Sequence, residues 1–104
     1  MSVEINIPPV LQALTGDIKQ INVTGRTVGE CLEELVKQYP RLKSRLFNRK
    51  NKLPNGINIF VNGENAYPEP LARAVHKGDK VHISYIVLGG YGLGGAKNRY
   101  FRSR

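Results

Sequence analysis

The spacing of the hydrophobic residues changes twice along this chain, and that change limits the folds it can adopt. Four segments place apolar residues at alternate positions over part or all of their length, a period of two that is typical of half-buried strands. These segments are residues 3–7, 18–23, 57–61 and 80–87. Between the second and the third, apolar residues recur with the period of one helix face, at Val28, Leu32, Leu35, Val36 and Tyr39. The sequence therefore predicts two strands, one helix and at least two further strands.

The ends of the helix carry their own signals. Thr27 and Glu30 form a T-x-x-E capping box, in which each side chain satisfies a free backbone N–H. Pro40 disfavours a helical conformation at Tyr39, so we expect the helix to end there. Cys31 lies beside the apolar stripe and has no His or Lys as an obvious partner. We therefore interpret it as a small core residue and not as a catalytic thiol.

Turn signals separate the later strands. Asn62-Gly63 is a strong hairpin dipeptide, and a short return strand is expected around residues 65–67. Lys77-Gly78-Asp79 marks a turn before the last strand. This order predicts a β-grasp, an α+β fold in which one main helix packs on one face of a mixed sheet of four to five strands. The expected core comprises Leu32, Leu35, Val36, Ile59, Val61, Val81 and Ile83, with Tyr85 and Val87 on the same strand face as the last two.

The tripeptide Leu-Gly-Gly occurs twice near the end of the chain. Leu88-Gly89-Gly90 follows the last strand, and Leu93-Gly94-Gly95 comes three residues later, before a basic run to Arg104. Glycine has no Cβ, so such a segment can pass through a narrow channel. Composition alone also fits a flexible linker to a basic tail. We expect a domain over residues 1–90 and a flexible basic extension over 91–104.

The net charge of +8 is unevenly placed. Residues 91–104 hold four Lys and Arg and no acid, and the remaining excess lies mainly in Arg41, Lys43, Arg45, Arg49, Lys50 and Lys52. Such runs are commonly solvated loops. A basic surface also attracts nucleic acid or an acidic protein surface, so both interpretations remain open.

The length of 104 residues fits one domain. One cysteine cannot form an internal disulfide, which favours a reducing compartment. The N-terminus lacks the pattern of a signal peptide, and no apolar run approaches the roughly 20 residues of a membrane span. We expect a cytoplasmic protein with no membrane partner.

Three stretches together resemble one known family. They are Asn58-Ile59-Phe60-Val61-Asn62-Gly63, then residues 77–83, then the step into Leu88-Gly89-Gly90. In this order they resemble the ubiquitin-like sulfur carrier proteins of the MoaD/ThiS group, over about residues 3–90. Within the group, the opening IPPVLQALTG and the VNGE turn are most similar to the carriers that deliver sulfur for cysteine synthesis.

The resemblance implies a carrier whose C-terminal glycine carboxylate is the reactive group. An E1-like adenylyltransferase joins AMP from ATP to that carboxylate, and sulfur then replaces AMP to give a thiocarboxylate. A sulfur-accepting synthase of the cysteine, thiamine or molybdopterin type would take the sulfur. No catalytic residue, bound cofactor or metal of its own is expected. We expect Phe60, Ile86 and Leu88 to contact the partner on the sheet face away from the helix.

The chain departs from the family pattern because it continues for fourteen residues after Gly90. Some members carry such an extension, which a zinc metalloprotease removes, and the resemblance implies the same here. Gly90, with Gly89 before it, lies at the family distance from the last strand and is the expected site of adenylation. Gly95, with Gly94, is the alternative terminus.

Two other functions compete with sulfur delivery. A small basic module could bind RNA through Tyr100, Phe101 and the arginines around them, although we expect no nucleic acid partner. A ubiquitin-like protein modifier would use the same activation chemistry. An enzyme is not expected, since His76 and His82 are isolated and no metal or triad spacing is present.

Overall fold

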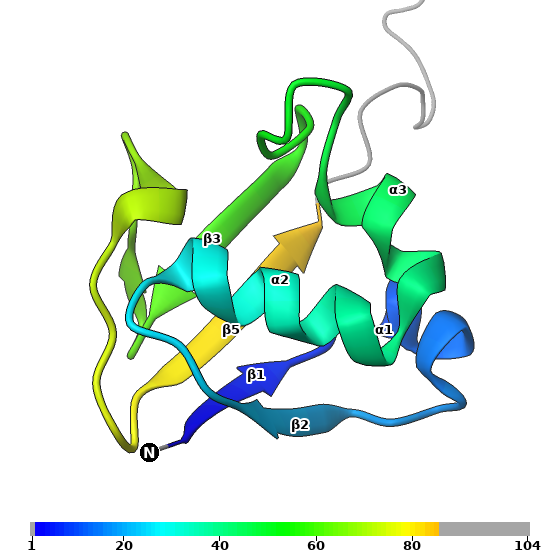
Figure 1. Cartoon of the computed structure of the whole chain (residues 1–104), viewed down its shortest axis with the longest axis horizontal. Coiled ribbons are helices and arrows are strands. Elements are labelled where there is room, and N and C mark those ends of the chain that lie inside the picture. The colour runs from blue at the N-terminus through cyan, green and yellow to red at the C-terminus, as the bar shows by residue number, and fades with distance from the viewer. Residues whose placement is uncertain (1, 86–104) are drawn as a thin grey trace, which may run out of the picture.

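The computed structural model describes residues 2–85, which form one five-stranded sheet with helices packed on one face (Figure 1). The strands lie in the order β2-β1-β5-β3-β4. Their bounds are Val3–Asn6 (β1), Gln20–Val23 (β2), Ile57–Val61 (β3), Glu64–Asn65 (β4) and Lys80–Tyr85 (β5). Strands β1 and β5 are parallel and the other neighbours are antiparallel. The predicted β-grasp fold with a mixed sheet is confirmed.

One long helix and several short ones complete the fold. The main helix is α2, Val28–Gln38, and it crosses the face of the sheet in Figure 1. The short helices are α1 (Pro9–Gln12), η1 (Ala13–Thr15), η2 (Pro40–Leu42), α3 (Lys43–Leu46) and η3 (Pro70–Ala72). The sequence did not predict α1, η1 or η3, because each is a single turn whose spacing shows no period.

The core lies between α2 and the sheet. Ile5 pairs with Val81, and Ile59 pairs with Ile83, so the three central strands bring their apolar residues into one layer. Six of the seven predicted core residues are buried, and Val36 packs against that core while partly exposed. Leu11 and Leu42, from the short helices, are also buried.

Helix α2 begins as the capping signal predicts. Thr27 Oγ1 accepts a hydrogen bond of 3.1 Å from the Glu30 N–H. The Glu30 carboxylate accepts one of 2.8 Å from the Arg26 N–H, one residue earlier than in the usual box. The helix ends at Gln38, with Tyr39 as its C-cap before Pro40.

Three strand predictions need correction. The second strand begins at Gln20, after an exposed Ile18, and the return strand is Glu64–Asn65, earlier than residues 65–67. Tyr85 is 36% exposed although Val81 and Ile83 on the same strand are buried. It is the last residue of β5, where a tyrosine can keep its ring partly packed and its hydroxyl in water.

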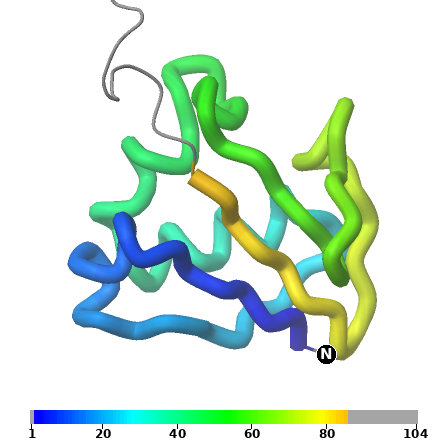
Figure 2. The backbone as a smooth tube through the Cα atoms, turned by 180° about the vertical axis from the view of Figure 1, so that it is seen from behind, coloured from blue at the N-terminus to red at the C-terminus, as the bar shows by residue number. Residues whose placement is uncertain are grey.

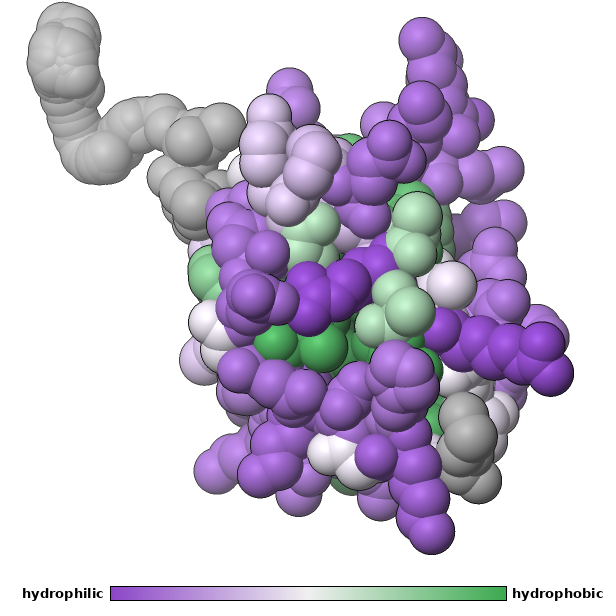
Figure 3. Space-filling model, turned by 90° about the vertical axis from the view of Figure 1, so that its left-hand side faces the viewer, coloured by the Kyte–Doolittle hydropathy of each residue, from purple (hydrophilic) through white to green (hydrophobic). Residues whose placement is uncertain are grey.

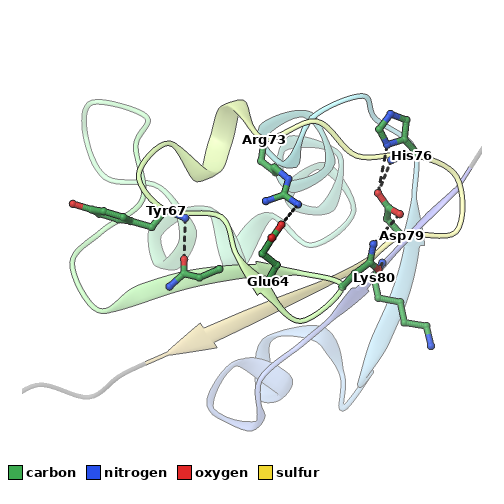
Figure 4. A network of polar contacts seen from close by, with 8 residues as sticks. Glu64, Tyr67, Arg73, His76, Asp79 and Lys80 are labelled. Carbon is green, nitrogen blue, oxygen red and sulfur yellow. Dashed lines mark hydrogen bonds and ion pairs between the residues drawn. The ribbon is translucent and has the colours of Figure 1, made fainter.

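A polar network holds the start of β5 against the β3–β4 hairpin (Figure 4). Asn62 and Gly63 have φ angles of 51° and 85°, as a tight hairpin turn requires. The Asn62 amide donates to the Asp79 carboxylate at 3.0 Å and accepts from the Lys80 N–H at 2.9 Å. The Asp79 carboxylate also accepts from the His76 N–H at 2.8 Å. The hairpin and the turn at residues 77–79 are therefore fixed to each other.

Candidate functional site

The end of β5 directs the chain toward the predicted reactive glycines. Tyr85, the last described residue, pairs with Ile57 at the start of β3. Strand β5 lies between β1 and β3, so hydrogen bonds hold it along both edges. Gly89, Gly90, Gly94 and Gly95 lie outside the described residues, as do Ile86, Val87 and Leu88 and the predicted domain boundary. Their roles remain predictions.

No helix formed by residues 2–85 covers one face of the sheet, which we call the uncovered face (Figure 2). Phe60 lies on this face, because its neighbours in β3, Ile59 and Val61, point into the core. Its side chain is half-buried. A shallow hollow on this face is lined by Asn6, Pro8, Phe60, His82, Ser84 and Tyr85, among others. The structure thus places Phe60 on the sheet face away from the helix, as predicted, opposite His82 of β5, and its contact with a partner remains a prediction.

Residues 41–56, which we call the basic segment, lie at the same end of the sheet as Tyr85 (Figures 1 and 2). All six of its Lys and Arg side chains are exposed. Sequence reasoning treated this run as a solvated loop or a binding surface without choosing between them. What it could not show was the position of the run, because the pairing of Ile57 with Tyr85 is a long-range contact.

Cys31 is fully buried between α2 and the sheet. Burial, with the nearby Glu30 charge, raises the pKa of its thiol to about 11. The thiolate is the reactive form of cysteine, and this pKa keeps the group protonated at neutral pH. The predicted packing role agrees with this position.

The two histidines lie apart from each other. His76 is 82% exposed at the turn before β5, with Nδ1 3.8 Å from the Asp79 carboxylate. His82 is exposed on the uncovered face. Among residues 2–85, no three His, Cys, Asp or Glu side chains gather as a metal site would require. In the same part of the chain, no helix has the length and apolar character to cross a membrane.

A second recess lies beside β3, where the short β4 leaves the edge of the sheet. Its walls include Leu53, Ile57, Tyr67, Pro68 and Leu71. Figure 3 views the molecule from the side of β4 and η3, and hydrophilic side chains dominate that view around a small apolar centre. Tyr67 is 79% exposed there. No sequence pattern indicates this recess, because its walls come from two separate stretches, residues 52–59 and 65–72.

Known proteins are similar to this chain in both sequence and fold. The model of the ThiS family matches residues 5–90. The sulfur carrier protein CysO of Mycobacterium tuberculosis is 34% identical over 93 residues, covering 86% of this chain and all of that protein. Small archaeal modifier protein 1 of Haloferax volcanii is 38% identical over 72 residues, covering 68% of this chain and 79% of the relative.

A solved structure agrees with the fold. The crystal structure of the Amycolatopsis orientalis BexX/CysO complex contains a chain that superposes with a TM-score of 0.76 at 32% identity. The match covers 85% of this chain and 99% of that one. Together with the family match, it shows that this β-grasp chain belongs to the ThiS family of ubiquitin-like proteins.

Proposed function

We propose that this protein is a sulfur carrier that works through a thiocarboxylate on Gly90. The observation that supports this most directly is the extent of the family match, which stops at Gly90, the second glycine after Leu88. CysO, named a sulfur carrier, is matched over its entire length by 86% of this chain. The bounds of the family match, residues 5–90, agree with a carrier that ends at Gly90.

The proposed chemistry needs a free carboxylate on Gly90. A carboxylate is a poor electrophile, so an adenylyltransferase first joins it to the AMP of ATP and releases pyrophosphate. A sulfur nucleophile supplied by the enzyme or its sulfur donor then displaces AMP, which leaves with the bonding electrons. If the nucleophile is sulfide, loss of its remaining proton leaves –COS⁻ on Gly90. If it is a protein persulfide, the acyl disulfide that forms is attacked at the protein's sulfur by a second thiolate; the S–S bond breaks, the two thiol groups end as a disulfide, and Gly90 leaves as –COS⁻. ATP is thus a substrate of the partner, and the carrier supplies only the terminal carboxylate.

The fold suits this task because it anchors the reactive end on its most constrained strand. Gly90 follows Tyr85 by five residues, and β5 pairs with β1 as far as His82 and with β3 as far as Tyr85. The enzyme can bind the body of the carrier while a short segment reaches into the active site. We propose that the uncovered face around Phe60 is the docking surface, with Ile86 and Leu88 completing the contact.

Residues 91–104 would block this chemistry, because Gly90 then forms a peptide bond with Tyr91. We propose that a zinc metalloprotease removes them. The test compares a chain ending at Gly90 with the full chain, each incubated with adenylyltransferase, ATP and a sulfur donor. Intact mass spectrometry should show a gain of about 16 Da, for sulfur replacing oxygen, only in the shorter chain. Sulfur found on a native protein that remains intact to Arg104 would contradict the proposal.

The repeated motif provides a matched control. Gly90→Ala in the shorter chain should slow adenylation, because its methyl group enters the channel that accommodates glycine. Gly95→Ala in the full chain should leave cleavage after Gly90 and later sulfur loading unchanged. If native protein ends at Gly95, the terminus is the second Leu-Gly-Gly and the proposed site is wrong.

The acceptor is proposed to be a synthase of the cysteine, thiamine or molybdopterin type. The Amycolatopsis orientalis structure is of a complex between CysO and a second protein, BexX, which supports the idea that carriers of this kind act through a bound partner. Transfer from the thiocarboxylate form to purified candidate synthases, followed by product analysis, would identify the acceptor.

Protein modification is a second candidate, favoured by the similarity to small archaeal modifier protein 1. It requires an isopeptide bond between Gly90 and a lysine of another protein. Peptides from cell extracts that carry such a branch would support it. A pool of this protein that occurs only as free chains and thiocarboxylate would exclude it.

A further inference from the structure

The positive charge of the folded domain comes entirely from the basic segment. Residues 41–56 contain six Lys and Arg and no acid. The rest of the described chain contains six Lys and Arg against eight Asp and Glu, a net charge of −2. In the form that ends at Gly90, the four cations of residues 91–104 are absent. The basic segment is then the one region that makes the carrier a cation.

These six cations face solvent without acidic partners. All six side chains are exposed, and the ion pairs found among residues 2–85 join Lys37 to Glu34, Arg73 to Glu64 and His76 to Asp79. None of those pairs involves the basic segment. Exposed like charges repel one another, so a grouping of six is stabilised by an external anion.

The backbone holds this surface in a defined shape. The Asn48 side chain accepts hydrogen bonds from the Lys50 and Lys52 N–H groups at 2.8 and 3.1 Å. The Asn48 N–H donates to the Lys52 carbonyl at 2.7 Å, which closes the loop. Asn51 completes the turn with a φ of 60°, a left-handed conformation that asparagine tolerates. Arg49, Lys50 and Lys52 therefore project from a preformed loop.

Apolar residues fix both sides of this loop to the core. Leu42 and Leu46 are fully buried, and Phe47 and Leu53 pack against the same core. The loop leads directly into β3, whose first residue, Ile57, pairs with Tyr85. The basic segment thus flanks the point from which the chain continues toward Gly90. A protein that binds the end of β5 at Tyr85 meets this surface beside it.

We propose that the basic segment docks on an acidic surface of the adenylyltransferase, beside the entrance to its active site. This inference rests on the proposed function. Attraction between the two surfaces accelerates encounter and orients the carrier with its C-terminal end toward the entrance. It acts alongside the apolar contact at Phe60, which lies on the uncovered face.

The chemistry of the segment favours an acidic protein over a nucleic acid. Its aromatic residue, Phe47, is half-buried against the core, so it offers no free ring on which a base can stack. The surrounding domain carries a net charge of −2 and would repel a phosphate backbone that extends past the loop. An acidic patch on a globular partner can instead be limited to the area of the basic segment, so that it does not face the acidic remainder of the domain.

The test uses two triple variants with the same loss of charge, both made in the chain ending at Gly90. One is Arg49→Gln with Lys50→Gln and Lys52→Gln, and the control is Lys19→Gln with Arg26→Gln and Lys77→Gln, all at exposed positions. Backbone groups of residues 50 and 52 still bond to Asn48 in the first variant. The association rate with the adenylyltransferase is measured by stopped flow at low and high NaCl.

At about 0.02 M NaCl, we expect the first variant to associate roughly tenfold more slowly than the unmodified chain, and the control less than twofold more slowly. The difference should largely vanish at about 0.5 M NaCl, where charges are screened. Equal effects of the two variants overturn this inference while normal adenylation upholds the proposed function. Failure of every form to be adenylated overturns both. Tighter binding to a 20-nucleotide oligothymidylate than to the enzyme at about 0.15 M NaCl also overturns the inference.

Discussion

The two faces of the sheet are built from alternate residues of the same strands, yet they differ in burial and in side-chain chemistry. In β3, Ile57, Ile59 and Val61 are buried under α2, whereas Asn58 and Phe60 lie half-buried on the uncovered face. On the face covered by α2, the side chains are aliphatic and are packed closely enough to exclude water. The uncovered face combines one aromatic ring with polar neighbours such as His82 and Ser84. The same strand therefore contributes both to the core and to the face that we propose as the docking surface. Substitutions on the two faces should have different effects.

The largest effect is expected on the covered face. Leu35 is fully buried in the middle of α2. Leu35→Ala should lower the free energy of unfolding by about 2–5 kcal/mol, because it removes buried methyl groups and leaves a cavity. Urea denaturation followed by circular dichroism measures this loss. Gln38→Ala, at an exposed position on the same helix, is the control, and a loss for Leu35→Ala as small as the control's would show that the core is wrongly assigned.

The uncovered face should show the opposite behaviour. Phe60→Asp should reduce kcat/KM for adenylation by roughly tenfold or more, since it places a charge in an apolar contact. The domain should remain folded by circular dichroism. Asn58→Asp adds the same charge on the same face, outside the hollow that Phe60 lines, and should have little effect. Adenylation that is equally fast in all three proteins would place the docking surface elsewhere.

A smaller effect is expected at the start of α2, on the covered side. Thr27→Ala removes the hydroxyl that accepts from the Glu30 N–H, and should lower the unfolding free energy by about 1 kcal/mol. Thr24→Ala, at an exposed position before the helix, is the matched control and should change stability less. Equal losses in the two variants would mean that the cap contributes nothing specific.

The smallest effect concerns pH and lies away from both faces. The hydrogen bond from the Asn62 amide, with that from the His76 N–H, lowers the pKa of the Asp79 carboxyl. A lowered folded-state pKa contributes stability above the unfolded pKa of about 4, and that stability is lost as the pH falls through the folded value. The melting temperatures of the wild type and Asp79→Asn should therefore converge on acidification below about pH 4. A gap that stays constant down to about pH 2 would contradict this assignment.

The sequence predicts the covered face well because local patterns determine it. The alternation in β3 and β5 and the stripe of α2 each assign residues to the core without knowledge of the partner segment. The Thr27 cap and the Asn62-Gly63 turn are equally local. Tyr85 shows the limit of such patterns. Alternation predicts that its side chain points into the core, but it is 36% exposed, because burial of the last residue of a strand depends on the segments packed around it.

The candidate site was less predictable because it depends on contacts between distant segments. Phe60 could be assigned to the uncovered face from its place in β3, but the hollow around it also needs β1 and β5. The basic segment was visible in the sequence as charge alone. Its place beside Tyr85 follows from the pairing of β3 with β5, and the closed loop depends on the Asn48 side chain. Neither has a sequence signature of its own.

The parallel pairing of β1 with β5 also governs when this protein can fold during its synthesis. Ile5 meets Val81 in that ladder, so almost the whole chain must be available before the central contact can form. A nascent chain that stops before residue 80 leaves the inner edges of both β1 and β3 without a neighbouring strand. Such a product exposes apolar surface to chaperones and proteases. Because Gly90 follows Tyr85 by only five residues, a chain long enough to complete β5 is within five residues of the proposed reactive terminus.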